Sequence, residues 1–157
     1  MRRTLLLLTI VLLGSSVPAV AQDAAAQKAA VMAAVQKLFD GMRARDTVAL
    51  AQVLDSSARL VTTFGANGVP DMDVTAVPVF IHIVATAQPG QLLDERIDTP
   101  VIELEDNLAS VWVKYRFYIG ERFSHCGLDA MQLARTINGW QIIALADTRR
   151  MPAECGT

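Results

Sequence analysis

The hydrophobic pattern of the chain changes character at Gly90. Before it, apolar residues recur at three- and four-residue steps, as on one face of a helix. After it, four β-prone runs follow at 92–104, 108–119, 122–137 and 140–149, separated by short turn-forming segments. Helices followed by consecutive strands indicate the α+β class. We expect the helices to pack on one side of a strongly curved antiparallel sheet.

Three N-terminal helices are predicted. The first covers 24–45, and its apolar stripe consists of Val31, Val35, Leu38, Phe39 and Met42. Asp46 is a favourable N-cap for a short second helix. A β-prone segment at 58–64 follows, and Thr75 is expected to cap a third helix with Pro78 in its first turn, where proline costs no helical hydrogen bond.

The first 21 residues have the features of a secretory signal peptide. Arg2 and Arg3 precede an apolar run at 5–13, and Ala19-Val20-Ala21 is a small-residue site of the kind that signal peptidase cleaves. The run is shorter than the roughly 20 residues that span a bilayer, although an uncleaved anchor is the alternative. We therefore expect a signal peptide at 1–21, a single domain at 22–157, and a periplasmic or secreted protein.

The charge balance argues against two classes of partner. The chain has 14 Lys and Arg against 16 Asp and Glu, and loss of the two N-terminal arginines leaves 12 basic groups and a net charge of −4. An acidic domain offers no basic surface to a phosphate backbone and is repelled by anionic lipid headgroups. We expect neither a nucleic-acid partner nor membrane binding after signal cleavage.

Export changes the interpretation of the two cysteines, Cys126 and Cys155. An even number of cysteines in an oxidising compartment favours a disulfide between them. The alternative is a Cys126 nucleophile beside His125, but adjacent residues of a strand point to opposite faces. One His-Cys pair with a remote Cys does not supply the ligands of a zinc site, so no metal is predicted.

Two hairpin turns define the expected faces of the sheet. With two-residue turns at Gly120-Glu121 and Asn138-Gly139, Arg116 lies opposite His125 and Trp112 lies opposite Asp129. The face containing these pairs is expected to hold Trp112, Lys114, Arg116, Tyr118, His125, Asp129, Met131, Leu133, Trp140 and Ile142. The other face is expected to hold Val111, Val113, Tyr115, Phe117, Cys126, Leu128, Ala130, Ile143, Leu145, Asp147 and Arg149. A bulge would exchange the partners beyond it.

The first of these faces is the predicted functional surface. His125 and Asp129 are the candidate catalytic residues, because a carboxyl group in apolar surroundings has a raised pKa and can move a proton. A mostly apolar cavity with a few polar groups is the usual form of a small-molecule site. The alternative is an Arg-Asp-His network on a solvated or dimer-packed sheet face. The candidate ligand-binding residues are Trp112, Arg116, Tyr118, Met131 and Trp140.

The order of elements resembles the NTF2-like superfamily, the cone-shaped α+β fold of nuclear transport factor 2, ketosteroid isomerase and SnoaL-type cyclases. The most specific part is the His-Cys-Gly-x-Asp block at 125–129, which is similar to an exported bacterial subgroup described as SnoaL-like or putative lumazine-binding. The resemblance covers about 24–155. It implies a deep cavity between the helices and the concave sheet, homodimerisation through the sheet, and no obligatory cofactor.

Three functions follow from this resemblance and the candidate residues. The leading hypothesis is an exported domain that binds a small, largely apolar ligand in the cone, with His125 and Asp129 as polar contacts. The enzymatic alternative is a cofactor-free acid/base cyclase or isomerase; the trio used by the steroid isomerases has no match position by position. The third hypothesis is a dimeric accessory module for an envelope protein. The fold alone does not select among them.

Overall fold

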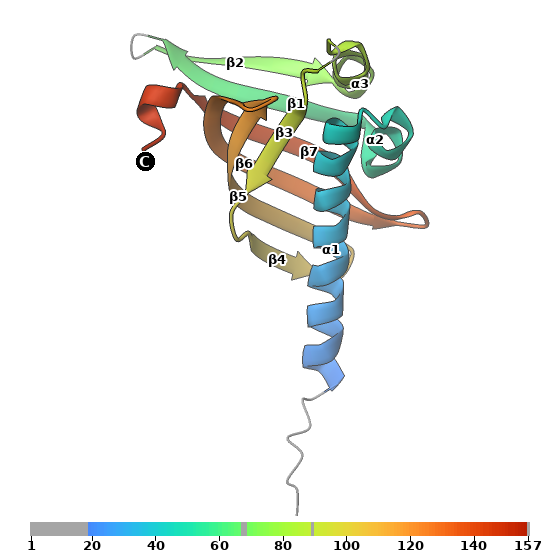
Figure 1. Cartoon of the computed structure of the whole chain (residues 1–157). Coiled ribbons are helices and arrows are strands. Elements are labelled where there is room, and N and C mark those ends of the chain that lie inside the picture. Colours follow the sequence, from blue (N-terminus) through green and yellow to red (C-terminus); the bar gives the residue numbers. More distant parts are fainter. Residues whose placement is uncertain (1–18, 67–68, 89, 157) are drawn as a thin grey trace, which may run out of the picture.

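The computed structural model describes residues 19–66, 69–88 and 90–156. The three α-helices form one layer and the curved sheet forms the other (Figure 1). Helix α1 crosses the sheet, and α2 and α3 lie together near one end of it. The helices are α1 (Ala19–Ala44), α2 (Thr47–Val53) and α3 (Val77–Thr86), followed near the C-terminus by a short 3-10 helix, η1 (Pro152–Glu154). The strands are β1 (Leu54–Ala66), β2 (Val69–Ala76), β3 (Leu93–Ile97), β4 (Val101–Glu105), β5 (Leu108–Ile119), β6 (Arg122–Thr136) and β7 (Gly139–Arg150).

The sheet has the order β2-β1-β7-β6-β5-β3, and β4 pairs with the other half of β5 beside β3. Every pair is antiparallel except β1 and β7, which run parallel. The expectation of an α+β domain with three helices on a curved, mainly antiparallel sheet is confirmed. The expectation of a purely antiparallel sheet is wrong for one pair, β1 and β7. These strands run parallel because the chain crosses from β2 at one edge of the sheet to β3 at the other edge, and returns to β1 only through β5, β6 and β7.

The first two helices agree closely with the sequence predictions. The stripe on α1 is buried against the sheet, with Val31 and Val35 fully buried and Leu38 and Phe39 each 1% exposed. Asp46 caps α2, since its Oδ1 accepts hydrogen bonds from the backbone N–H groups of Val48 (3.0 Å) and Ala49 (2.9 Å). In the described part of the chain, no helix combines the length and apolar content needed to cross a membrane.

Two sequence expectations are wrong in detail. The segment before α3 forms β2, so that helix begins at Val77 after Ala76 rather than after a Thr75 cap. β2 is an edge strand, a position where Pro70 and the nearby acidic residues are tolerated although they are poor strand formers. The run at 92–104 is two strands, β3 and β4, which pair with successive halves of β5.

Residues 1–18 of the predicted signal peptide at 1–21 lie outside the described residues. α1 begins at Ala19 and its backbone runs through the expected cleavage site after Ala21. Cleavage and the domain boundary at 22 stay predictions.

The predicted disulfide is present between Cys126 on β6 and Cys155 just after η1, two positions 29 residues apart. Cys126 is 4% exposed, and η1 packs against β6 beside it. The bond therefore fixes the C-terminal segment to the sheet. It also removes the reactive-thiol alternative for Cys126, because a disulfide sulfur is not a thiolate.

Reduction of this disulfide is expected to destabilise the protein by about 3 kcal/mol, because the bond closes a loop of about 30 residues in the unfolded chain. Urea unfolding with and without a reductant measures the difference. Thiol titration of the denatured, unreduced protein is expected to find no free thiol. Two titratable thiols in protein taken from an oxidising compartment would contradict the assignment.

Candidate functional site

A cavity of about 510 Å³ lies between the helices and the inner, concave face of the sheet. Its volume is in the range of small-molecule sites. The helices contribute only apolar side chains to its wall, among them Phe39 and Met42 from α1 and Phe80 and Ile83 from α3. The polar groups come from the strands, and four of them are acidic, against one arginine.

Strand register brings these polar groups to one wall. Phe117 on β5 pairs with both Glu95 on β3 and His125 on β6, so these three residues share the inner face. Asp129 on β6 pairs with Asp147 on β7, again on the inner face. All five side chains line the cavity.

Two β-bulges produce this arrangement and correct the predicted faces. The Gly120-Glu121 turn forms as expected, but Ser124 is an extra residue between the pairs Tyr118–Phe123 and Phe117–His125. Beyond the bulge Asp129 is opposite Val113 rather than Trp112, and His125 is opposite Phe117 rather than Arg116. Because side chains alternate along a strand, this single insertion exchanges the β5 residues that face His125 and Asp129.

The second hairpin differs in the same way. Its two-residue turn is Ile137-Asn138, and Gly139, with a φ of +96°, begins β7. Ile143 is an extra residue between the pairs Gln132–Ala144 and Leu133–Ile142. The bulge turns Leu145, Asp147 and Arg149 to the inner face, where they line the cavity.

The predicted site residues therefore separate into three groups. His125 and Asp129 line the cavity. Trp112, Arg116 and Tyr118 lie on the outer face of β5, where Trp112 is 57% exposed. Met131 and Trp140 are 1% and 8% exposed and belong to the hydrophobic core, away from the cavity wall. The expectation that all seven surround one ligand rested on a register without bulges.

A pair of carboxyl groups forms the innermost polar feature. Asp129 is 2% exposed, and its side chain hydrogen-bonds to that of Glu95. Burial raises the pKa of Asp129 to about 7 against the effect of this hydrogen bond, and the charge of Asp147 raises it further. Burial and the charge of Asp129 raise the pKa of Glu95 well above its usual value. A hydrogen bond between two carboxyls requires a proton on one of them, so the pair retains a proton near neutral pH.

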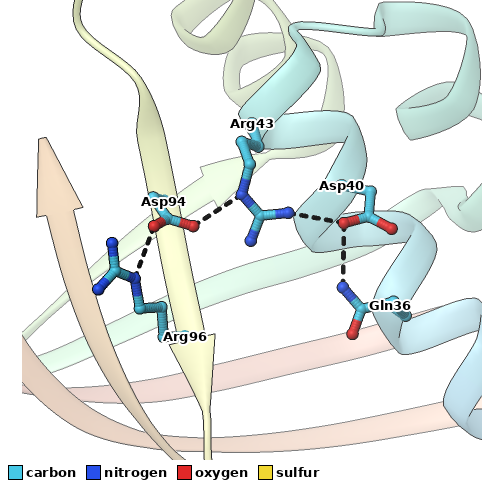
Figure 2. A network of polar contacts seen from close by, with 5 residues as sticks. All are labelled: Gln36, Asp40, Arg43, Asp94 and Arg96. Carbon is cyan, nitrogen blue, oxygen red and sulfur yellow. Dashed lines mark hydrogen bonds and ion pairs between the residues drawn. The ribbon is translucent and has the colours of Figure 1, made fainter. Parts of the chain in front are cut away.

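Asp94, the neighbour of Glu95 on β3, has the opposite environment on the other side of that strand. Figure 2 shows Arg43 of α1 and Arg96 converging on its two oxygens, each with a 2.7 Å hydrogen bond from Nε. Burial alone would raise the pKa of Asp94, but these two guanidinium groups hold it below its usual value. Arg96 also stacks over the ring of Tyr118, 4.1 Å from its centroid. Of the two consecutive acids on β3, Asp94 therefore forms ion pairs with two arginines, whereas Glu95 forms none in the described part of the chain.

Asp147 is held by neutral hydroxyl donors. The Thr62 hydroxyl donates to its Oδ1 at 2.7 Å, and the Tyr115 hydroxyl lies 3.1 Å from its Oδ2 and 3.0 Å from the Thr148 carbonyl oxygen. Burial, and then the charge of Asp147, raise the pKa of Tyr115. Tyr115 therefore stays a protonated hydrogen-bond donor at all ordinary pH values.

His125 is neutral at physiological pH. Burial lowers its pKa to about 4, and the positive charge of Arg149 acts in the same direction. Its ring stacks on Phe117 with centroids 4.8 Å apart and meets Tyr115 edge-on at 5.7 Å. Its Nδ1 lies 3.1 Å from the Ser124 hydroxyl. The ring can donate or accept a hydrogen bond in the cavity but carries no charge there.

The middle residue of the His-Cys-Gly-x-Asp block has a steric role. A Cβ on Gly127 would lie 1.7 Å from the Thr148 carbonyl oxygen and 2.7 Å from Cε1 of Tyr115. Gly127 therefore lets the Tyr115 ring and β7 approach the backbone of β6. In this block His125 and Asp129 face the cavity while Cys126 holds the C-terminal segment on the opposite face.

Sequence reasoning missed Glu95, Tyr115 and Asp147 as cavity residues. A signal for Glu95 was present, since Leu93 and Ile97 flank it at alternate positions and an apolar alternation of this kind indicates the inner face. No comparable signal identifies the bulges that place Asp147. Among residues 19–66, 69–88 and 90–156 no cluster of three or more His, Cys, Asp or Glu has the arrangement needed to hold a metal ion.

Residues 26–146 match the family model described as "Putative lumazine-binding". The chain belongs to this family. No functionally curated protein matches the sequence. The "Putative lumazine-binding" assignment agrees with the predicted NTF2-like superfamily, and the solved structures below agree with the fold.

The fold is similar to those of several NTF2-like proteins. One of unknown function from Silicibacter pomeroyi has a TM-score of 0.62 at 16% identity, over 81% of this chain and 98% of that one. One from Salmonella enterica has a TM-score of 0.62 at 14% identity, over 85% and 96%. One from Novosphingobium aromaticivorans, with a cystatin-like fold, has a TM-score of 0.66 at 9% identity, over 88% and 89%. At these identities the likeness concerns the fold alone.

At pH 8 the free energy of unfolding of the Asp129→Asn variant is expected to exceed that of the natural protein by about 1–3 kcal/mol. The raised pKa of Asp129 means that the folded state binds a proton more tightly than the unfolded state, so stability falls as pH rises from about 4 through about 7. Urea unfolding at pH 5 and pH 8 measures this.

The matched control is Asp73→Asn, which also removes a carboxylate from the cavity wall but at an exposed position. Its stability difference from the natural protein should not change between the two pH values. An Asp129→Asn difference that is the same at pH 5 and pH 8 would show that Asp129 is already ionised in the folded state.

Proposed function

We propose that the protein binds a small, largely apolar molecule in the cone cavity. The observation that carries the proposal is the 510 Å³ cavity, whose helical side is apolar and whose sheet side presents the Glu95–Asp129 pair, Tyr115 and His125. Apolar walls supply affinity through burial, and a few fixed polar groups supply orientation. Membership in a family described as "Putative lumazine-binding" supports a small-molecule ligand.

Export and dimerisation are part of the same proposal. The Cys126–Cys155 disulfide supports a periplasmic or secreted location, since such bonds persist in oxidising compartments. Trp112 on β5 pairs with Val101 on β4 on the outer face of the sheet, where they are 57% and 59% exposed. Exposed apolar groups of this size on the outer face of the sheet support the pairing of two copies through the sheet, or the docking of an envelope partner.

Native mass spectrometry of the protein isolated from its own source cells tests these points in one spectrum. We expect a chain that lacks residues 1–21, a dimer mass, and a bound small molecule that can be released and identified. An empty protein that gains no mass from a library of apolar small molecules would contradict the binding function and favour an accessory module.

A substitution at the cavity wall gives an independent test. Ile83 on α3 lines the cavity yet is 54% exposed, so Ile83→Trp should narrow the cavity without forcing a large side chain into the core. We expect at least a tenfold loss of affinity for the identified ligand, measured by calorimetry. The control is Val79→Trp on the same helix, 53% exposed and not part of the cavity wall, which should leave affinity unchanged. Equal effects of the two variants would place the ligand elsewhere.

A second candidate function is cofactor-free acid/base catalysis, favoured by the pKa of about 7 at Asp129. A group with this pKa can both accept and return a proton at neutral pH, and the neutral ring of His125 can donate a hydrogen bond to a substrate oxygen. Asp129→Asn should then lower turnover of the identified ligand by about 10²–10⁴-fold while its affinity changes much less. A turnover rate that does not fall would remove Asp129 from the chemistry.

A further inference from the structure

Acidic groups outnumber basic ones on the inner wall of the cavity. Among the described residues, Asp73, Glu95, Asp129 and Asp147 line this wall, against one basic residue, Arg149, whose side chain is exposed. His125 is neutral at physiological pH, and α1 and α3 contribute no titratable side chain to the wall. Within the described ranges, no lysine or arginine forms an ion pair with Glu95, Asp129 or Asp147.

Arginines are available nearby but lie on the other side of the strand. Arg43 and Arg96 both hydrogen-bond to Asp94, whose side chain is 9% exposed (Figure 2). Glu95, one position later, forms no ion pair with either arginine. A buried acid without a cation lowers the stability of the folded protein. The fold thus pairs the acid that faces away from the cavity with two arginines, whereas the acid that faces into it forms no ion pair in the described part of the chain.

A second observation indicates a missing donor at the same place. Oδ2 of Asp129 is buried and has no hydrogen-bond donor in the described part of the chain. Buried carboxylate oxygens are almost always hydrogen-bonded, so such an atom in the wall of a ligand-sized cavity suggests a group that arrives with the ligand. Glu95 keeps a partly exposed side chain on that wall and is within reach of such a group.

We infer that the ligand carries a protonated amine on an apolar body, and that the ammonium group binds at Glu95 and Asp129. This inference rests on the proposed function and specifies the class of its ligand. The apolar body contacts Phe39, Phe80 and Phe117, which line the same cavity. Binding exchanges the proton held by the carboxyl pair for the ligand's positive charge, so the carboxyls ionise and the displaced proton leaves to solvent.

This exchange makes binding dependent on pH in a defined direction. The amine competes with protons for the carboxyl pair, so its affinity should rise by up to about tenfold per pH unit between pH 5 and pH 7. The other groups facing the pair are Asp147 and Arg149 from β7, Tyr115 from β5, His125 from β6 and Asp73 from β2. His125 and Tyr115 keep one protonation state across this range, so they do not contribute to the change.

Three probes with one ring system test the inference on the full mature chain. They are 1-naphthylmethylamine, 1-naphthalenemethanol and 1-naphthoate, which present a cation, a neutral hydroxyl and an anion. Calorimetry at pH 7.5 should give the amine at least tenfold tighter affinity than the alcohol, and the carboxylate the weakest. Titrations at pH 6 in two buffers of different ionisation enthalpy should show release of about one proton with the amine and none with the alcohol.

The Glu95→Gln/Asp129→Asn double variant should abolish the preference for the amine while retaining affinity for the alcohol, which also shows that its cavity is intact. Asp71→Asn, an exposed acid on β2 that is not part of the cavity wall, should leave the preference unchanged. If the alcohol binds the natural protein as tightly as the amine, or the double variant keeps the preference, the inference is wrong and the proposed binding function stands. If none of the three probes binds, both are contradicted.

Discussion

A single extra residue in β6, Ser124, determines which side chains of the long β5–β6 hairpin enter the cavity. Side chains alternate strictly along a strand, so everything beyond the bulge takes partners one position away from those of a regular hairpin. Glu95, Tyr115, Phe117, His125 and Asp129 meet on one wall because of this displacement. The bulge at Ile143 does the same for Asp147 and Arg149 on β7. Without the bulge at Ser124, Asp129 would lie on the face opposite Glu95, and the two acids would not meet.

The acid pair is the least favourable part of the structure for folding. Asp129 is 2% exposed, and neither Asp129 nor Glu95 forms an ion pair with a lysine or arginine of the described residues. Titratable groups with displaced pKa values collect at functional sites, because function requires environments that stability alone would not select. The same strand shows the contrast directly, since Asp94 is stabilised by two arginines and Glu95 is not.

The sequence allowed most of the fold to be predicted, because its determinants are local. The apolar stripe of α1, the Asp46 cap, the Gly120-Glu121 turn and the pairing of Cys126 with Cys155 were each recognised from residues close in the chain or from cysteine count. The residues predicted for the site share a wall only in part. His125 and Asp129 line the cavity, whereas Trp112, Arg116 and Tyr118 lie on the other side of β5, because no residue pattern indicates the extra position at Ser124. The parallel pairing of β1 with β7 is likewise a property of the assembled sheet, not of either strand.

Side chains between Ser124 and Asp129 alternate between the two faces of the sheet, so this stretch contributes to both of them. His125, Gly127 and Asp129 form the cavity side, and Cys126 forms the side that anchors the C-terminal segment. Deletion or insertion of one residue here would exchange the two sets, turning the disulfide toward the cavity and the acid toward the outer face of the sheet. Related chains can therefore vary this stretch by substitution, whereas a change in its length would have to be offset by a second change of length within the same strand.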